Sequence, residues 1–150
     1  MEERTVTSPV GHLTIRTEND QVTALIWGTG GEDDSPLLRM AEEQLAHYFG
    51  GTLTSFALPL RLGTTTFQEQ FLQSLIDIPF GETRTYGDLA IQLGASAQAI
   101  GQACGANPIP ILIPCHRVLA ANGLGGFSGG TGIESKVALL RHEGAASLLL

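Results

Sequence analysis

The chain has 150 residues, of which 43% are hydrophobic and 15% are charged, a length that supplies one compact core or two small lobes sharing an interface. Its apolar runs are shorter than the roughly 20 residues that span a bilayer, and the charged start at residues 1–4 is not that of an export signal. Eight basic and fifteen acidic residues leave a net charge of −7, which argues against a broadly basic surface for phosphate binding. We therefore expect a soluble, cytoplasmic protein without membrane contact.

The acidic residues are unevenly distributed along the chain. Most of them precede Gly50, whereas acidic and basic residues balance from Pro79 onward. A nucleic-acid-binding face is therefore expected only in the second half of the chain. The two cysteines, Cys104 and Cys115, occur in an otherwise ordinary composition, which indicates a reducing compartment rather than a disulfide framework.

Residues 1–62 are predicted to form a small α+β scaffold lobe. Alternating apolar and polar residues predict strands at Thr5–Ile15 (interrupted by a turn at Ser8–Gly11), Val22–Trp27 and Leu53–Leu62. Ser35 is expected to cap a helix that has Pro36 at its first position and ends at Gly50. None of these elements carries obvious chemistry, so we interpret the lobe as scaffold.

Residues 63–150 are predicted to form a mainly helical lobe packed on the first, which makes the chain an α+β protein. Cap and breaker residues predict a helix that is capped by Thr66 and stopped by Pro79–Gly81, a second over Tyr86–Leu93 and a third from Ala97 to about Gly105. Thr85 caps the second helix, with Asp88 in an approximate capping box, and Ser96 caps the third. Two short helices joined by a turn with Gly94 match the helix-turn-helix pattern, although an αα-corner without DNA contact shares it.

The third helix has an unusual composition, because it contains Gly101 and Gly105 and no charged residue. Each interior glycine destabilises a helix by roughly 1 kcal/mol relative to alanine. Close approach of the backbone to another surface, or tight packing against the neighbouring helix, would explain both glycines.

The segment from Asn107 to Val118 is the most informative part of the chain. Its apolar stretch, Ile109–Ile113, is interpreted as a buried strand that delivers Cys115 to a point beside His116 and Arg117. Basic neighbours favour the thiolate form of cysteine, which is the nucleophile. The pattern therefore indicates a reactive cysteine, and the alternative is a small hydrophobic side chain in the core.

His116 is not expected to contact Cys115 directly, because neighbouring side chains of an extended chain point to opposite faces. A bridging water or a sharp turn would be needed to connect them. Cys104 lies one helical turn after Ile100, so we expect it to fill the core.

Several motifs in a fixed order resemble the O6-alkylguanine-DNA alkyltransferase family. They are Ile78–Gly87, Asn107–Pro108, Pro114–Val118, Gly125–Gly130 and Lys136–Gly144. The resemblance covers about Phe67 to Gly144, and the first lobe resembles the family more loosely. It implies a DNA repair protein whose partner is double-stranded DNA containing O6-alkylguanine, which needs no cofactor or metal and acts as a monomer.

The resemblance also implies four catalytic residues. Cys115 would accept the alkyl group irreversibly, so that each molecule acts once. His116 would take the thiol proton through a water, and Glu143 would orient His116. Tyr86 would push the target nucleotide out of the base stack and donate a proton to the leaving guanine, because the alkylated oxygen is inaccessible within a duplex.

Further residues are implied to contact DNA or the flipped base. They are Gln68, Thr85, Gly87, Ala97, Gln98, Asn107, Phe127 and Ser128. Among them, Asn107 would join the helix-turn-helix to the cysteine strand, and Phe127 and Ser128 would lie in a loop that closes over the base.

The chain departs from the family pattern at two places. Gln98 stands where the family has an arginine that fills the gap left by the flipped base, and no Lys or Arg lies between Arg84 and Arg117. Phe127 also replaces the tyrosine of many relatives. One alternative function is a weakly DNA-binding damage sensor or partner-dependent member of the family. The other is a cysteine hydrolase using Cys115, His116 and Glu143, although adjacent cysteine and histidine residues form a poor direct dyad.

Overall fold

The computed structural model describes residues 1–127 and 129–145 and contains two compact units. The first unit consists of residues 1–61 and 108–112, and the second of residues 62–107 and the described residues from Ile113 onward. The sequence places residues 108–112 in the second lobe, whereas the structure places them in the first unit. Among the described residues, no helix has the length and apolar character needed to cross a membrane.

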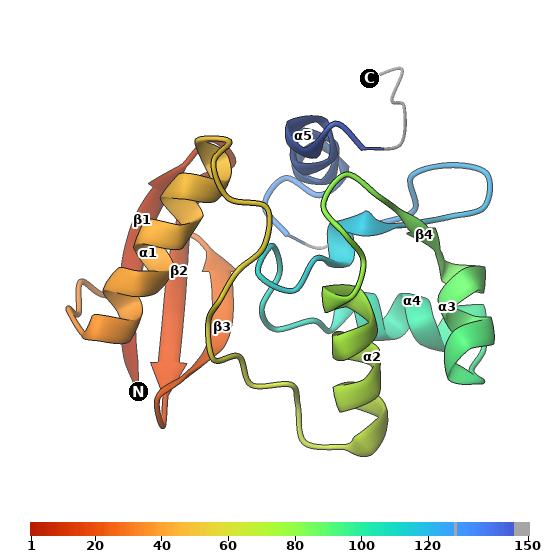
Figure 1. Ribbon diagram of the computed structural model, residues 1–150, viewed down its shortest axis with the longest axis horizontal. Helices are drawn as coiled ribbons and strands as arrows, with labels where there is room; N and C mark the ends of the chain where they lie inside the picture. Colours follow the sequence, from red (N-terminus) through yellow and green to blue (C-terminus); the bar gives the residue numbers. More distant parts are fainter. Residues whose placement is uncertain (128, 146–150) are drawn as a thin grey trace. The chain divides into compact units, whose positions relative to one another are not determined.

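The first unit is an antiparallel three-stranded sheet with one helix packed against it (Figure 1). Its elements are β1 (Glu2–Ser8), β2 (Gly11–Glu18), β3 (Gln21–Trp27) and α1 (Pro36–Phe49). Asn19 and Asp20 both adopt positive φ, which suits the two-residue hairpin turn between β2 and β3. The Ser35 side chain accepts a hydrogen bond from the amide of Leu38, so the predicted helix start is confirmed.

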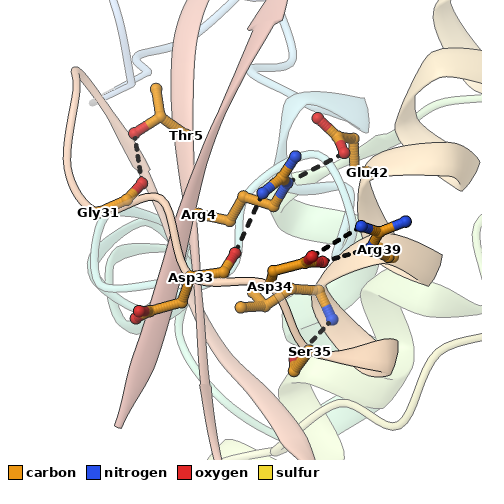
Figure 2. Close-up of polar contacts among 9 residues, drawn as sticks. Arg4, Thr5, Gly31, Asp33, Asp34, Ser35, Arg39 and Glu42 are labelled. Atoms are coloured by element: carbon orange, nitrogen blue, oxygen red, sulfur yellow. Dashed lines mark hydrogen bonds and ion pairs between the residues drawn. The ribbon is translucent and has the colours of Figure 1, made fainter.

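Charged side chains of the first unit fasten the segment before α1 to strand β1 (Figure 2). Arg4 donates to the carbonyl of Asp33 at 3.2 Å and to the carboxylate of Glu42 at 3.0 Å. Arg39 of α1 forms an ion pair with Asp34. Part of the acidic excess in this half of the chain is therefore engaged in holding the unit together.

The prediction of a strand over Leu53–Leu62 is wrong. Only Leu60 forms a bridge to Val22, where the amide of Val22 donates to Pro59 and the amide of Arg61 donates to Val22. Upstream, the backbone of Ala57 is hydrogen-bonded in both directions by the side chain of Gln44. These contacts satisfy backbone groups of Ala57, Pro59 and Arg61, and the segment forms a single bridge to the sheet.

The prediction of an extended strand over Ile109–Ile113 is also wrong. The amide of Leu25 in β3 donates to the carbonyl of Pro108, but the chain then turns, and Ile111 adopts a φ of 72°. A left-handed conformation is rare for a β-branched residue. Burial of Ile109, Ile111 and Leu112 holds this turn in place.

The second unit is mainly helical, and the mixed α and β class expected from the sequence is confirmed. Its elements are α2 (Thr66–Ile76), β4 (Arg84–Thr85), α3 (Tyr86–Leu93), α4 (Ala97–Gly105), the 3-10 helix η1 (Cys115–Arg117), β5 (Val118–Leu119) and α5 (Ile133–Glu143). Strand β4 pairs with β5 in parallel, which places the start of α3 next to the segment that follows Cys115. The sequence predicts Thr66 as the cap of the first helix, whereas the structure has Thr65 as the cap and Thr66 as the first helical residue, so the helix begins one residue earlier than predicted.

The predicted pair of short helices, α3 and α4, is confirmed, and the two helices pack against each other. Thr85 and Asp88 form a complete capping box, and Gly94 ends α3 in the left-handed conformation with a φ of 65°. Ser96 caps α4 by accepting from the amide of Ala99. Each cap satisfies an amide that a helix start leaves without a partner.

Thr85→Ala is expected to lower the free energy of unfolding by about 1 kcal/mol, because the amide of Asp88 loses its acceptor. Thr85→Ser keeps the hydroxyl and serves as the matched control. Chemical denaturation of both variants tests this. Equal stability of the alanine and serine variants would show that the cap contributes nothing.

Candidate functional site

A cavity of about 480 Å³ lies within the second unit, a volume in the range of small-molecule sites. Its lining residues come from the start of α3, from α4, from η1 and from the loop before α5: Tyr86, Gly101, Cys104, Gly105, Cys115, Gly126 and Phe127. Cys104 therefore lines this cavity, and the expectation that it fills the core is wrong.

The two glycines of α4 leave room in this cavity. Apart from its chain neighbours and the backbone of α4 itself, a Cβ atom built on Gly101 or Gly105 would meet no atom of the described residues within 4 Å. Tight packing against a neighbouring helix is therefore not the reason for these glycines. They remove two side chains from the α4 wall of the cavity, which Cys104 also lines.

Cys115 lies at the start of a sharp turn. The amide of Cys115 donates to Ile113 at 2.8 Å and that of Arg117 donates to Pro114 at 3.1 Å, so residues 115–117 form a 3-10 helix. Sequence reasoning required a sharp turn or a water between Cys115 and His116, and the structure contains the turn. It puts the thiol at the cavity, whereas the imidazole of His116 is completely buried.

The Cys115 thiol is protonated at rest. Burial raises its pKa, and this effect outweighs a hydrogen bond from Asn107 and the nearby charge of Lys136, both of which lower it. Burial and the neighbouring Cys115 likewise raise the pKa of Cys104 to about 12. A reaction at Cys115 therefore needs a group that removes the thiol proton.

His116, Arg117 and Glu143 form a buried polar network. His116 Nε2 lies 2.8 Å from Glu143 Oε2, and Arg117 donates to both oxygens of the same carboxylate at 2.8 and 2.9 Å. His116 Nδ1 is buried, and within residues 1–127 and 129–145 it has no hydrogen-bond partner. One ring nitrogen is thus fixed, and the other is available to accept a proton.

The pKa directions assign the charges in this network. Burial lowers the pKa of His116, although Glu143 opposes that effect, so the imidazole is neutral. Burial alone would raise the pKa of Glu143, but hydrogen bonds from His116 and Arg117 bring it down to about 2. An ionised Glu143 can only accept, so the imidazole proton is assigned to Nε2 and Nδ1 carries the lone pair.

Tyr86, the first residue of α3, is held by the loop that precedes α5. The backbone of Gly126 hydrogen-bonds to its hydroxyl, and burial raises its pKa, so the phenol keeps its proton. Gly125 has a φ of 72°, and a Cβ atom there would lie 2.7 Å from the Tyr86 hydroxyl. Only glycine permits this approach.

Lys136 is a site residue that sequence reasoning did not single out. Its ammonium group donates to the carbonyls of Val118 at 2.6 Å and Gly126 at 3.2 Å, and it lies 5.9 Å from the centre of the Tyr86 ring. It is 1% exposed, and burial lowers its pKa. The sequence could have indicated this burial, because Leu139 and Leu140 follow Lys136 at helical spacing and place it on the buried face of α5.

The remaining predicted residues lie at several places. Thr85 and Gly87 are at the start of α3, and Ala97 and Gln98 form the exposed first turn of α4. Asn107 donates to the carbonyl of Ile113 at 2.9 Å, which joins the end of α4 to the segment before Cys115. Gln68 is exposed on α2 and accepts from the amide of Thr64. Ser128 lies outside the described residues.

The site is thus a buried cysteine at the wall of a cavity, with a neutral histidine next to it in the chain and a helix-turn-helix beside it. The sequence model named 6-O-methylguanine DNA methyltransferase, DNA binding domain, matches residues 66–145. A methylated-DNA–protein-cysteine methyltransferase of Mycolicibacterium paratuberculosis is 41% identical over 100% of this chain and 98% of its own length. The constitutive Bacillus subtilis protein of the same name is 38% identical over 93% of each chain.

Solved structures agree with the sequence comparisons. The crystal structure of Mycobacterium tuberculosis OGT in complex with DNA superimposes with a TM-score of 0.84 at 41% identity, and covers 96% of this chain and 93% of that one. The chain therefore belongs to the family of methylated-DNA–protein-cysteine methyltransferases.

Gly101→Ala is expected to raise the free energy of unfolding by up to about 1 kcal/mol, because alanine favours the helix and its Cβ meets open space. Gly125→Ala is expected to lower it by more than about 1 kcal/mol, because of its positive φ and the contact with Tyr86. Urea denaturation measures both changes. A fully stable Gly125→Ala variant would contradict the close contact of the loop with Tyr86.

Proposed function

We propose that this protein repairs DNA by moving an alkyl group from O6 of guanine irreversibly onto Sγ of its own Cys115. The observation that carries the proposal is the buried thiol at a base-sized cavity, followed in the chain by a neutral histidine that an ionised carboxylate orients. Family membership supports the same reaction, as do the names of the relatives.

The transfer is a displacement at carbon. The Cys115 thiol gives its proton through a water to His116 Nδ1, and Sγ forms a bond to the alkyl carbon. The bond from that carbon to O6 breaks, and its electron pair stays on the guanine, which takes a proton from the Tyr86 hydroxyl. A positioned thiolate needs no cofactor for this step, and the thioether product ends the activity of the molecule.

Access to the damaged base requires the nucleotide to leave the duplex. We place the DNA on the α3–α4 pair, because Tyr86 starts α3 and lines the cavity, and because Gln98 is exposed at the start of α4. Phe127 lines the same cavity and would cover the flipped base. Thr85, Gly87, Ala97 and Gln68 would contact the DNA strand.

Helix α4 has Gln98 and no positive charge, so this chain would bind the DNA phosphates more weakly than a protein with a basic helix at this position. Its contacts with phosphates would come from backbone amides and neutral side chains more than from Lys and Arg. We propose that it acts as a monomer, as the family resemblance implies. We also propose that it acts in the cytoplasm, where free thiols such as Cys104 and Cys115 persist.

Cys115→Ser is expected to abolish alkyl transfer and to leave the fold intact. Mass spectrometry after incubation with O6-methylguanine DNA measures the transfer. One added methyl group is expected per wild-type molecule. Cys104→Ser is the matched control and should retain transfer, because the proposed base His116 is adjacent to Cys115 and not to Cys104.

Transfer that persists in Cys115→Ser, or an adduct that moves to Cys104, would exclude the proposed acceptor. Repeated turnover without an adduct would instead indicate a cysteine hydrolase. DNA binding without adduct or turnover would indicate a damage sensor.

Gln98→Arg is expected to raise the rate of transfer from duplex O6-methylguanine DNA and to leave the rate with free O6-benzylguanine nearly unchanged. Arginine adds a charge and a planar group that fill the vacated position better than glutamine, and flipping costs a few kcal/mol only in the duplex. The salt dependence of binding should steepen by about one phosphate contact. Stopped-flow rates on both substrates test this prediction. Equal rates of the wild type and of Gln98→Arg on duplex DNA would mean that base flipping relies on other residues.

A further inference from the structure

Arg117 is the third member of the buried network, and the transfer steps above do not use it. Its Nε donates to Glu143 Oε1 at 2.8 Å and its Nη2 donates to Oε2 at 2.9 Å, while Nη1 donates to the carbonyl of Ile78 at 2.7 Å. The Phe80 ring lies 5.8 Å from the guanidinium carbon. The guanidinium is therefore fixed from the α5 side and from the segment that follows α2.

Glu143 Oε2 is shared between two donors, His116 Nε2 at 2.8 Å and Arg117 Nη2. A two-pronged contact from arginine fixes the plane of a carboxylate as well as its position. The carboxylate cannot rotate away from His116 without breaking both contacts with Arg117. The orientation of the imidazole therefore depends on Arg117 through Glu143.

Charge balance gives Arg117 a second effect. A buried carboxylate next to an imidazole favours the doubly protonated ring, and that ring cannot accept another proton. The charged groups that act on His116 are Glu143 and Lys136 of α5 and Arg117 of η1. Arg117 offsets the negative charge of Glu143 directly, because it contacts both of its oxygens.

We propose that Arg117 is a positioning residue for alkyl transfer: by holding both oxygens of Glu143, it keeps His116 in the neutral form whose Nδ1 accepts the Cys115 proton. This role rests on the proposed function, because it acts on the base of that reaction. The other explanation of the same contacts is a structural anchor that joins η1 to α5. The two explanations differ in what they predict for the rate of correctly folded molecules.

Because each molecule of the protein reacts once, a single experiment distinguishes these two explanations. In single-turnover reactions with O6-benzylguanine, the amplitude reports the fraction of active molecules, and the rate constant reports how fast those molecules react. Arg117→Gln removes the charge and Arg117→Lys keeps it, while both lose the two-pronged contact. Rate constants are measured across pH for the wild type and both variants.

We expect the rate constant of both variants to fall about tenfold at neutral pH, as for other groups that orient a reacting side chain. In Arg117→Gln, loss of the positive charge raises the pKa of His116, so the decline of the rate on the acid side begins at higher pH than in the wild type. In Arg117→Lys the acid-side decline stays near that of the wild type. Reduced amplitudes with unchanged rate constants and unchanged pH profiles would overturn the proposal and leave Arg117 as an anchor.

A second measurement does not require the variants to fold. Nitrogen NMR of wild-type protein labelled at histidine is expected to show His116 at neutral pH as the neutral ring with its proton on Nε2. A doubly protonated ring, or a proton on Nδ1, would overturn the proposal. Wild-type protein that gives this spectrum but forms no adduct with O6-benzylguanine would contradict the proposed function instead, so the two failures are distinguishable.

Discussion

The Glu143 carboxylate is a negative charge buried at the end of α5, and the geometry around Cys115 depends on how that charge is compensated. Desolvation of an ionised carboxylate is expensive unless hydrogen bonds and an opposite charge replace the lost water. The consecutive residues His116 and Arg117 supply three donors that help to replace it. The requirement to satisfy one buried group therefore holds the residues after Cys115 in a single conformation. A tight turn next to the thiol and an oriented imidazole are two results of the same constraint.

The residues around the cavity, in contrast, lower the stability of the fold and leave space. Gly101 and Gly105 weaken α4, and the free volume beside them forgoes the packing contacts that a filled core would make. Cys104 and Cys115 are thiols in an apolar environment that holds them in the protonated form. Local rules of helix stability are thus broken where the site needs room, which is the place where such departures are expected in a functional protein.

Local signals in the sequence were sufficient to predict helices α3 and α4 and to propose Cys115 as the acceptor. Thr85, Ser96 and Gly94 act through contacts within a few residues, so their pattern alone predicts α3 and α4. The motif around Cys115 is local in the same way, and it predicts the reactive residue. The family resemblance then assigned roles that composition and periodicity could not assign.

The errors arose where long-range contacts override local preference. Residues 53–62 have the alternation of a strand, but Gln44 and Val22 satisfy their backbone groups. The apolar run Ile109–Ile113 has high strand propensity, yet burial of its side chains stabilises a turn with a left-handed isoleucine. Cys104 has the spacing of a core residue, but Gly101 and Gly105 leave a cavity beside it where core side chains would otherwise pack.

The path of the chain before Cys115 limits how this protein can be divided. Residues 108–112 fold with the first unit, although Asn107 on one side and Ile113 on the other belong to the second. A fragment that begins near residue 62 would contain the whole reactive motif but would lack the sheet whose Leu25 amide binds Pro108. Its buried isoleucines would then face water and promote aggregation. The proposed acceptor, Cys115, therefore follows closely on a segment that folds with the first unit, so shortening the protein to its motif-bearing half separates that segment from the sheet it is hydrogen-bonded to.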